Sequence, residues 1–114
     1  MKRLQDWEEA YPAGVADIYW KRTAHVFAEA LWSETDFVAI DCSRQGTDEM
    51  DKCIGGILQE QHGHRKGTWV WNVTARLPGP RFPFATQGRE ESQESAKHRL
   101  VQCYEDMVRF YATR

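Results

Sequence analysis

Alternation of apolar and polar side chains is clearest between residues 68 and 77. With the single exception of Val70, the apolar side chains there occupy every second position: Trp69, Trp71, Val73, Ala75 and Leu77. Successive side chains of a strand point to opposite faces, so this period of two predicts a half-buried β-strand with an aromatic inner face. We expect the polar residues between them to meet solvent.

A helical period replaces this alternation near the C-terminus. From about Ser92 to Ala112, the apolar residues recur at steps of four, three, four and three: Ala96, Leu100, Cys103, Met107 and Phe110. This spacing predicts one face of a long amphipathic helix, with Ser92 as its N-cap. We expect this helix to cover the aromatic face of the predicted strand.

The N-terminal third of the chain allows two interpretations. Steps of four and three between apolar residues favour a helix over residues 17–33, and the alternative is a strand pair at Ile18–Trp20 and Val26–Ala28. Residues 1–15 are expected to be an N-terminal extension, because Tyr11–Gly14 contains a proline and a glycine that interrupt regular structure.

Two further apolar runs predict strands in the middle of the chain. Phe37–Cys42 contains β-branched residues, and Ile54–Gln61 carries the pair Gly55-Gly56, which indicates a bulge or a close approach by another element. His62–Gly67 is the expected hairpin tip. Three prolines between Leu77 and Gly88 predict an irregular loop there.

Together these elements predict an α+β domain. The expected order is α-β-β-β-α, with a three-stranded antiparallel sheet and helices packed on one face. We expect the 114 residues to form a single domain, with residues 16–114 making the α-β-β-β-α unit.

Composition and charge exclude several classes of protein. Hydrophobic residues make up 41% of the chain, which indicates a folded domain. The formal net charge of −2 argues against a dedicated duplex-binding domain, which carries a basic excess. No apolar run is long enough to span a membrane, and the N-terminal charges precede no signal-peptide core. Three cysteines without a C-x-x-C pair predict reduced thiols and a cytoplasmic location.

Residues with obvious catalytic or metal-binding chemistry are few. His62 and His64 lack further ligands at a suitable spacing, so we predict no metal site. Cys42 or Cys103 as a nucleophile would need His25 or His98 as its base, and Cys103 lies on the apolar face of the predicted helix. The acidic residues between 36 and 51 are expected to form a solvated surface. We therefore predict no cofactor and no enzymatic activity.

Two surfaces are candidates for binding. The first combines basic and aromatic residues that could hold a protein partner or a nucleic acid, with Trp71 or Phe82 stacking on bases: His64, Arg65, Lys66, Arg76, Arg81, Phe82 and Phe84. The second lies on the flank of the last helix, beside the loop from Leu77 to Phe84, and predicts a homodimer: Tyr104, Val108 and Tyr111.

The expected order of helix, three strands and helix is similar to the double-stranded-RNA-binding fold. The half of the chain from Ile54 to Arg114 also resembles two DNA-binding modules. The pattern Trp69, Trp71, Gly88, Glu94 and Ala96 resembles the arm-binding domains of phage-type integrases and the plant ethylene-response-factor domain. The resemblance implies a three-stranded sheet packed against a helix. Glutamates stand at 90, 91 and 94, where the RNA-binding family has phosphate-gripping lysines, and only Lys97 matches.

A closer similarity is to small uncharacterised proteobacterial proteins with the pattern G-x-I, W-x-W and E-x-A-K. The matching residues are Gly56-Ile57, Trp69-Val70-Trp71 and Glu94-Ser95-Ala96-Lys97. This resemblance implies a fold and no activity. From the sequence we expect a non-enzymatic binding or protein-interaction module with an unknown protein or small-molecule partner. The alternatives are a nucleic-acid-binding domain that uses the sheet and basic hairpin, and a small enzyme without a recognisable motif.

Overall fold

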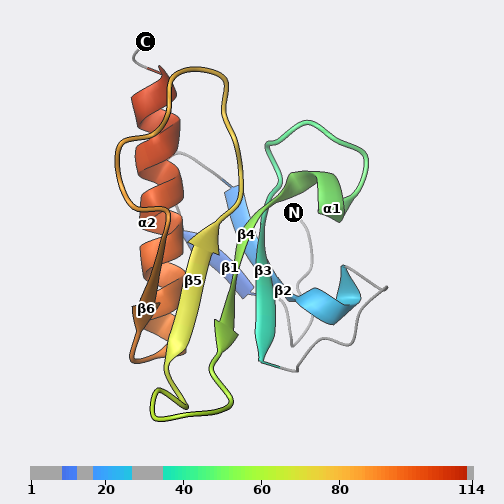
Figure 1. Cartoon of the computed structure of the whole chain (residues 1–114). Helices are drawn as coiled ribbons and strands as arrows, with labels where there is room; N and C mark the ends of the chain where they lie inside the picture. The colour runs from blue at the N-terminus through green and yellow to red at the C-terminus, as the bar shows by residue number, and fades with distance from the viewer. Residues whose placement is uncertain (1–8, 13–16, 27–34, 113–114) are drawn as a thin grey trace.

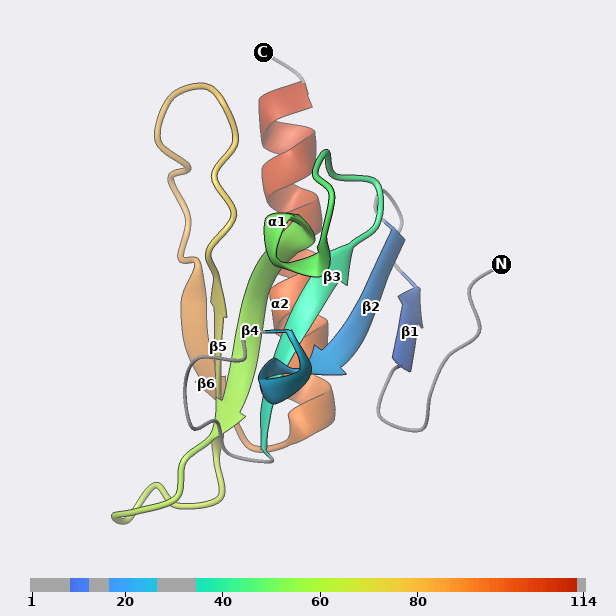
Figure 2. The same cartoon turned by 90° about the vertical axis from the view of Figure 1, so that its right-hand side faces the viewer.

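The computed structural model describes residues 9–12, 17–26 and 35–112. In these ranges six antiparallel strands form one sheet, and the helix α2 (Gln93–Ala112) covers one of its faces (Figures 1 and 2). The strands lie in the sheet in chain order: β1 (Glu9–Pro12), β2 (Asp17–Arg22), β3 (Asp36–Asp41), β4 (Cys53–Gln59), β5 (Trp69–Val73) and β6 (Gln87–Glu90). A 3₁₀ turn, η1 (Thr23–His25), follows β2, and a short helix, α1 (Glu49–Lys52), precedes β4.

The predicted class is confirmed, but the predicted sheet of three strands is too small. The predicted helix over residues 17–33 is wrong at its start, because Asp17–Arg22 is the strand β2 and the 3₁₀ turn η1 follows. The strand alternative was right for Ile18–Trp20; residues 27–34 lie outside the described residues. Ile18 and Trp20 are buried in the core beneath α2, whereas Tyr19 belongs to a second buried cluster. A strand buried on both faces shows no alternation, so its pattern also matches a helix.

The two edge strands were missed because neither carries an alternating apolar pattern. Glu9–Pro12 forms β1 instead of interrupting regular structure, and its proline is tolerated because β1 lies at the edge of the sheet. Gln87–Glu90 forms β6 at the other edge, and it begins within the last two residues of the predicted irregular loop. Its small residue, Gly88, lies opposite Trp71 of β5.

The inner face of β5 and the apolar face of α2 form the main core. The predicted alternation is confirmed, since Trp69, Trp71, Val73 and Ala75 are all buried. On α2 the predicted stripe is also confirmed for its buried members Ala96, Leu100, Cys103 and Met107, while Phe110 is partly buried. The predicted cap is present as well: the Ser92 hydroxyl accepts a hydrogen bond from the Ser95 N–H at 3.1 Å.

Two glycines allow the strands around this core to approach closely. A Cβ at Gly88 would lie 2.8 Å from Nε1 of Trp71, so only glycine lets β6 cross the indole. A Cβ at Gly55 would lie 2.2 Å from the backbone oxygen of Asn72. The register between β3 and β4 shifts next to Gly55, which confirms the predicted bulge and close approach.

In the part of the chain that the structure describes, no helix combines the length and apolarity needed to cross a bilayer.

We predict that Trp71→Ala lowers the free energy of unfolding by about 3–5 kcal/mol, the range for a large aromatic side chain lost from a core. The matched control is Asn72→Ala, because Asn72 is the next residue of β5 and is exposed on the other face. Its expected effect is below about 1 kcal/mol. Equal losses for the two variants in urea melts would contradict the assigned faces of β5.

Candidate functional site

The largest hollow of the described residues lies within the loop between β5 and β6. Its volume is about 830 Å³, and both arms of the loop and the C-terminal part of α2 line it. Arg76 and Arg81 lie on its wall, together with Phe82 and Phe84. Four of the seven residues of the predicted partner surface therefore meet around one hollow.

Aromatic contacts fix this loop against the end of α2. The Phe82 ring lies 5.4 Å from Phe84, 5.5 Å from Phe110 and 6.5 Å from Tyr111 between ring centroids. The Tyr111 hydroxyl donates a 2.6 Å hydrogen bond to the backbone oxygen of Pro80. Gly79, with φ of +138°, passes so close to Tyr111 that a Cβ there would lie 2.8 Å from its ring. These contacts shape the hollow in the free chain.

Phe84 is the exception within this cluster, because 68% of its surface remains exposed. It lines the large hollow and also a second one of about 200 Å³ between the loop and α2. Arg76 and Arg81 are exposed, and neither has an ion pair or hydrogen bond within the described ranges. An exposed aromatic ring beside unpaired guanidinium groups is a composition typical of interfaces.

The predicted dimer surface on α2 is largely covered within the monomer. Tyr104 is 2% exposed and belongs to the core, so its assignment to a surface was wrong. Val108 and Tyr111 are partly buried against the same core. The loop covers the flank of α2 that the sequence left open. What remains exposed of the predicted apolar patch is mainly Phe84.

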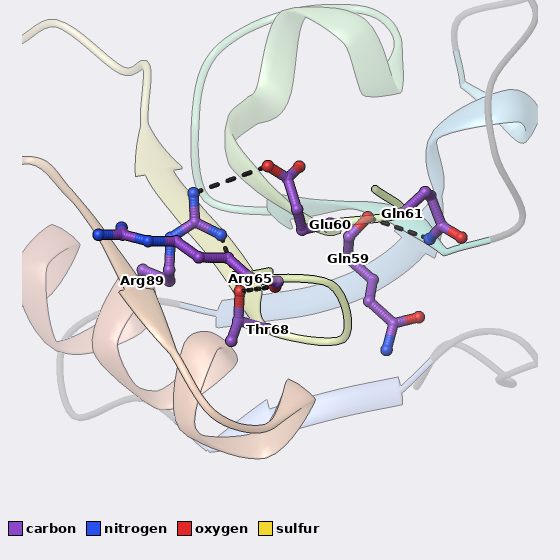
Figure 3. Close-up of polar contacts among 6 residues, drawn as sticks. All are labelled: Gln59, Glu60, Gln61, Arg65, Thr68 and Arg89. Atoms are coloured by element: carbon purple, nitrogen blue, oxygen red, sulfur yellow. Dashed lines mark hydrogen bonds and ion pairs between the residues drawn. The ribbon is translucent and has the colours of Figure 1, made fainter. Parts of the chain in front are cut away.

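The basic hairpin lies at the opposite end of the sheet from the loop (Figure 1). His64, Arg65 and Lys66 are all exposed there, so the predicted surface is divided into two separate parts. Figure 3 shows how the base of the hairpin is held. The Thr68 hydroxyl donates to the backbone oxygen of Arg65 at 2.6 Å and accepts from the Arg89 guanidinium at 2.7 Å, and Arg89 also lies 3.9 Å from Glu60.

The aromatic residue of the sheet that was expected to stack on bases is not accessible. Trp71 is 2% exposed beneath α2, and its Nε1 is buried without a hydrogen-bond partner in the described part of the chain. Lys97, which matches the RNA-binding pattern, is 4% exposed, and its Nζ lies 5.4 Å from the Trp20 ring centroid and 5.6 Å from that of Phe37. Its ammonium group packs over aromatic rings instead of reaching a phosphate.

A buried polar cluster joins the end of β3 to α2. Asp41 is 2% exposed, which contradicts its assignment to a solvated acidic surface. Its Oδ2 accepts a 2.6 Å hydrogen bond from the Tyr104 hydroxyl, and its Oδ1 accepts from the N–H and hydroxyl of Ser43 at 2.9 and 2.6 Å. Burial and the Asp41 bond raise the pKa of Tyr104 to about 12, against the opposing effect of Arg44. The cluster is a structural link between the sheet and the helix.

Cys103, one of the two cysteines considered as a nucleophile, is poorly activated. Burial and the nearby Asp106 raise the pKa of Cys103 to about 11, so its thiol is protonated at neutral pH. Its Sγ instead donates to the backbone oxygen of Ala85 at 3.4 Å. Burial also raises the pKa of Cys53. Over the described ranges, no group of three or more His, Cys, Asp or Glu side chains could hold a metal ion.

Comparison with protein-family models, with curated proteins and with solved structures returned no match.

We predict that Tyr104→Phe lowers the free energy of unfolding by about 1–3 kcal/mol, because it leaves a buried Asp41 oxygen without a partner. Tyr111→Phe is the matched control, since it removes a tyrosine hydroxyl that is exposed at the loop. We expect a smaller loss for this variant in urea melts at neutral pH. Equal stability of Tyr104→Phe and the wild type would contradict the role of the cluster.

The Tyr104 hydroxyl also makes the stability of the fold depend on pH. The pKa of about 12 in the folded chain exceeds the ordinary value of about 10, so folding favours protonated Tyr104. Its stabilisation is complete below about pH 10 and is lost as the pH rises through 12. Spectrophotometric titration at 295 nm should show a late-ionising component that is missing in Tyr104→Phe.

Proposed function

We propose that this chain is a non-enzymatic interaction module that binds an acidic segment of a partner protein in the hollow of the β5–β6 loop. The observation that carries the proposal is the position of Arg76, Arg81 and exposed Phe84 on the wall of one hollow of about 830 Å³. Arginine presents several N–H donors to a carboxylate, and the aromatic ring supplies apolar contact beside it.

The pre-formed shape of the loop supports binding without a large ordering cost. Phe82 and Tyr111 anchor the loop to α2 in the free chain, so a partner would not have to immobilise it. The hollow is also large enough for several side chains of an extended segment, because ligand sites in proteins have volumes of about 300–1,000 Å³.

Nucleic-acid binding through the sheet and the basic hairpin is the alternative. The exposed side chains of Arg65 and Lys66 support it. Of its two expected stacking residues, Trp71 is buried, and Phe82 lies in the β5–β6 loop away from the hairpin. The two surfaces lie far apart, so they can be tested separately. The homodimer predicted from the sequence also stays part of the proposal. Free thiols at Cys42, Cys53 and Cys103 support the further proposal of a cytoplasmic location.

The test is the binding of a fluorescent peptide rich in aspartate and containing one leucine, followed by fluorescence anisotropy at several salt concentrations. We predict that the double variant Arg76→Ala/Arg81→Ala weakens this binding about tenfold or more, because two charged contacts are lost. Phe84→Ala should also weaken it.

The matched control is Arg65→Ala/Lys66→Ala, which removes the same charge at the far hairpin. Retained peptide affinity in this control locates the binding in the loop. Equal losses in both double variants would indicate nonspecific attraction and contradict the proposal. Tighter binding of a single-stranded oligonucleotide, lost in Arg65→Ala/Lys66→Ala, would select the nucleic-acid alternative instead.

A further inference from the structure

The outer edge of β6 carries backbone groups that point away from the sheet. The Val73 N–H donates to the Thr86 oxygen at 2.8 Å, which makes these two residues a hydrogen-bonded pair. Bonded and non-bonded pairs alternate along an antiparallel ladder, so Gly88 and Glu90 also bond to β5. The N–H and C=O groups of Gln87 and Arg89 therefore point outward.

An outward-facing edge of this kind is a template for another strand. We infer that a second copy of this chain pairs with β6 along this edge, so that the two sheets continue into one across a two-fold axis. The inference deepens the proposed homodimer by naming its surface, and it is independent of peptide binding in the loop.

The sequence of β6 is self-complementary when the axis passes at Gly88. Gln87 then pairs with Arg89 of the second copy, and these are the residues whose backbone groups point outward. The two copies of Gly88 meet at the centre, where a non-bonded antiparallel pair brings Cα atoms within about 4.5 Å and side chains would crowd. An axis at Arg89 would instead place two arginines opposite each other, which is unfavourable.

The position of α2 along β6 determines which residues of the two helices would lie at the level of the two-fold axis. The Cys103 contact with Ala85 places these two residues at the same level. Gly88 lies three residues beyond Ala85, a distance of about 10 Å at about 3.3 Å per strand residue. A helix covers the same distance in about six or seven residues, because it rises about 1.5 Å per residue. Because α2 runs back along β6, the axis falls near residues 96 and 97 of α2 (Figure 1).

An axis at that level places Arg99 opposite Glu94 of the second copy, and Glu94 opposite its Arg99. Both side chains line the same 330 Å³ hollow beside β6, so they lie on the flank of α2 that would face the second copy. The α2 helices pack over β5, and the two β5 strands would be three strand spacings, or about 14 Å, apart. Long side chains reaching from both helices can span this gap.

Both charged side chains stay accessible in the free chain, and the Arg99 guanidinium also packs over Trp71, with 5.6 Å between Cζ and the ring centroid. Arg99 has an ion-pair distance of 4.0 Å to Glu90, and 55% of its side chain is exposed. Glu94 is exposed as well. The pairing would thus replace the long Arg99–Glu90 ion pair of each copy by an Arg99–Glu94 pair between the copies, two pairs for two.

Sedimentation of the full chain over a range of concentrations tests the inference. We expect a reversible dimer in the wild type and a monomer in Gln87→Pro, because proline removes one outward N–H without removing a bond to β5. Gln87→Ala keeps this N–H and should keep the dimer. Circular dichroism and thermal melts should show that both variants are folded like the wild type.

A charge exchange provides the second, independent variant set. Glu94→Arg alone and Arg99→Glu alone should each weaken the dimer, because like charges then face each other, and the double exchange should restore it. A monomeric wild type at all concentrations would overturn both the homodimer and this surface. A dimer that persists in Gln87→Pro but is lost in Phe84→Asp would overturn this surface alone and place the contact at the loop.

Discussion

The contact between Trp71 and helix α2 is the interaction on which the rest of the structure depends. Trp71 lies at the centre of β5, 2% exposed, between the apolar face of α2 and the strand β6. Because its indole fills this space, the next strand can cross it only at a glycine, and Gly88 occupies that position. The packing of one side chain thus fixes the place of the helix and of the edge strand together.

This packing also determines which parts of the molecule are left for binding. Trp71, which was expected to stack on bases, is buried in the core. Lys97 is buried there as well, over the Trp20 ring. The accessible groups include the β5–β6 loop with Phe84, the basic hairpin and the outer edge of β6. We therefore expect the function to lie in surfaces that associate with a partner. The raised pKa of Cys103 makes this thiol a poor nucleophile, which agrees with that expectation.

The C-terminal half of the fold could be predicted from the sequence because its periodicities are strong. The alternation around Trp71, the helical stripe through Leu100 and the cap at Ser92 all agree with the structure. β2 was misassigned because a strand buried on both faces matches a helical spacing equally well. β6 has no apolar pattern, because its contribution to the core is to leave room for the Trp71 indole. The contact between Gly88 and this indole joins two strands, so the local sequence around Gly88 does not predict it.

The candidate site was predicted in part for a similar reason. Residue type alone identified Arg76, Arg81 and Phe84, but the path of the chain separates them from the hairpin residues by the length of the sheet (Figure 1). Tyr104 was assigned to the surface because it lies beside the strict apolar stripe of α2, which was expected to cover the sheet alone. Its hydroxyl is buried because Asp41, distant in the sequence, supplies a partner inside the core. Such pairings follow from topology, which a single sequence does not encode in its local pattern.

We propose that this chain acts through association of its exposed edges. Hydrogen exchange of single amides in β6, measured at two protein concentrations, tests this most directly. The account predicts that the amides of Gln87 and Arg89 are protected at high concentration and exchange rapidly after dilution. Those of Gly88 and Glu90, which bond to β5, should stay protected at both concentrations. Exchange at Gln87 and Arg89 that is equally rapid at both concentrations would contradict pairing at this edge.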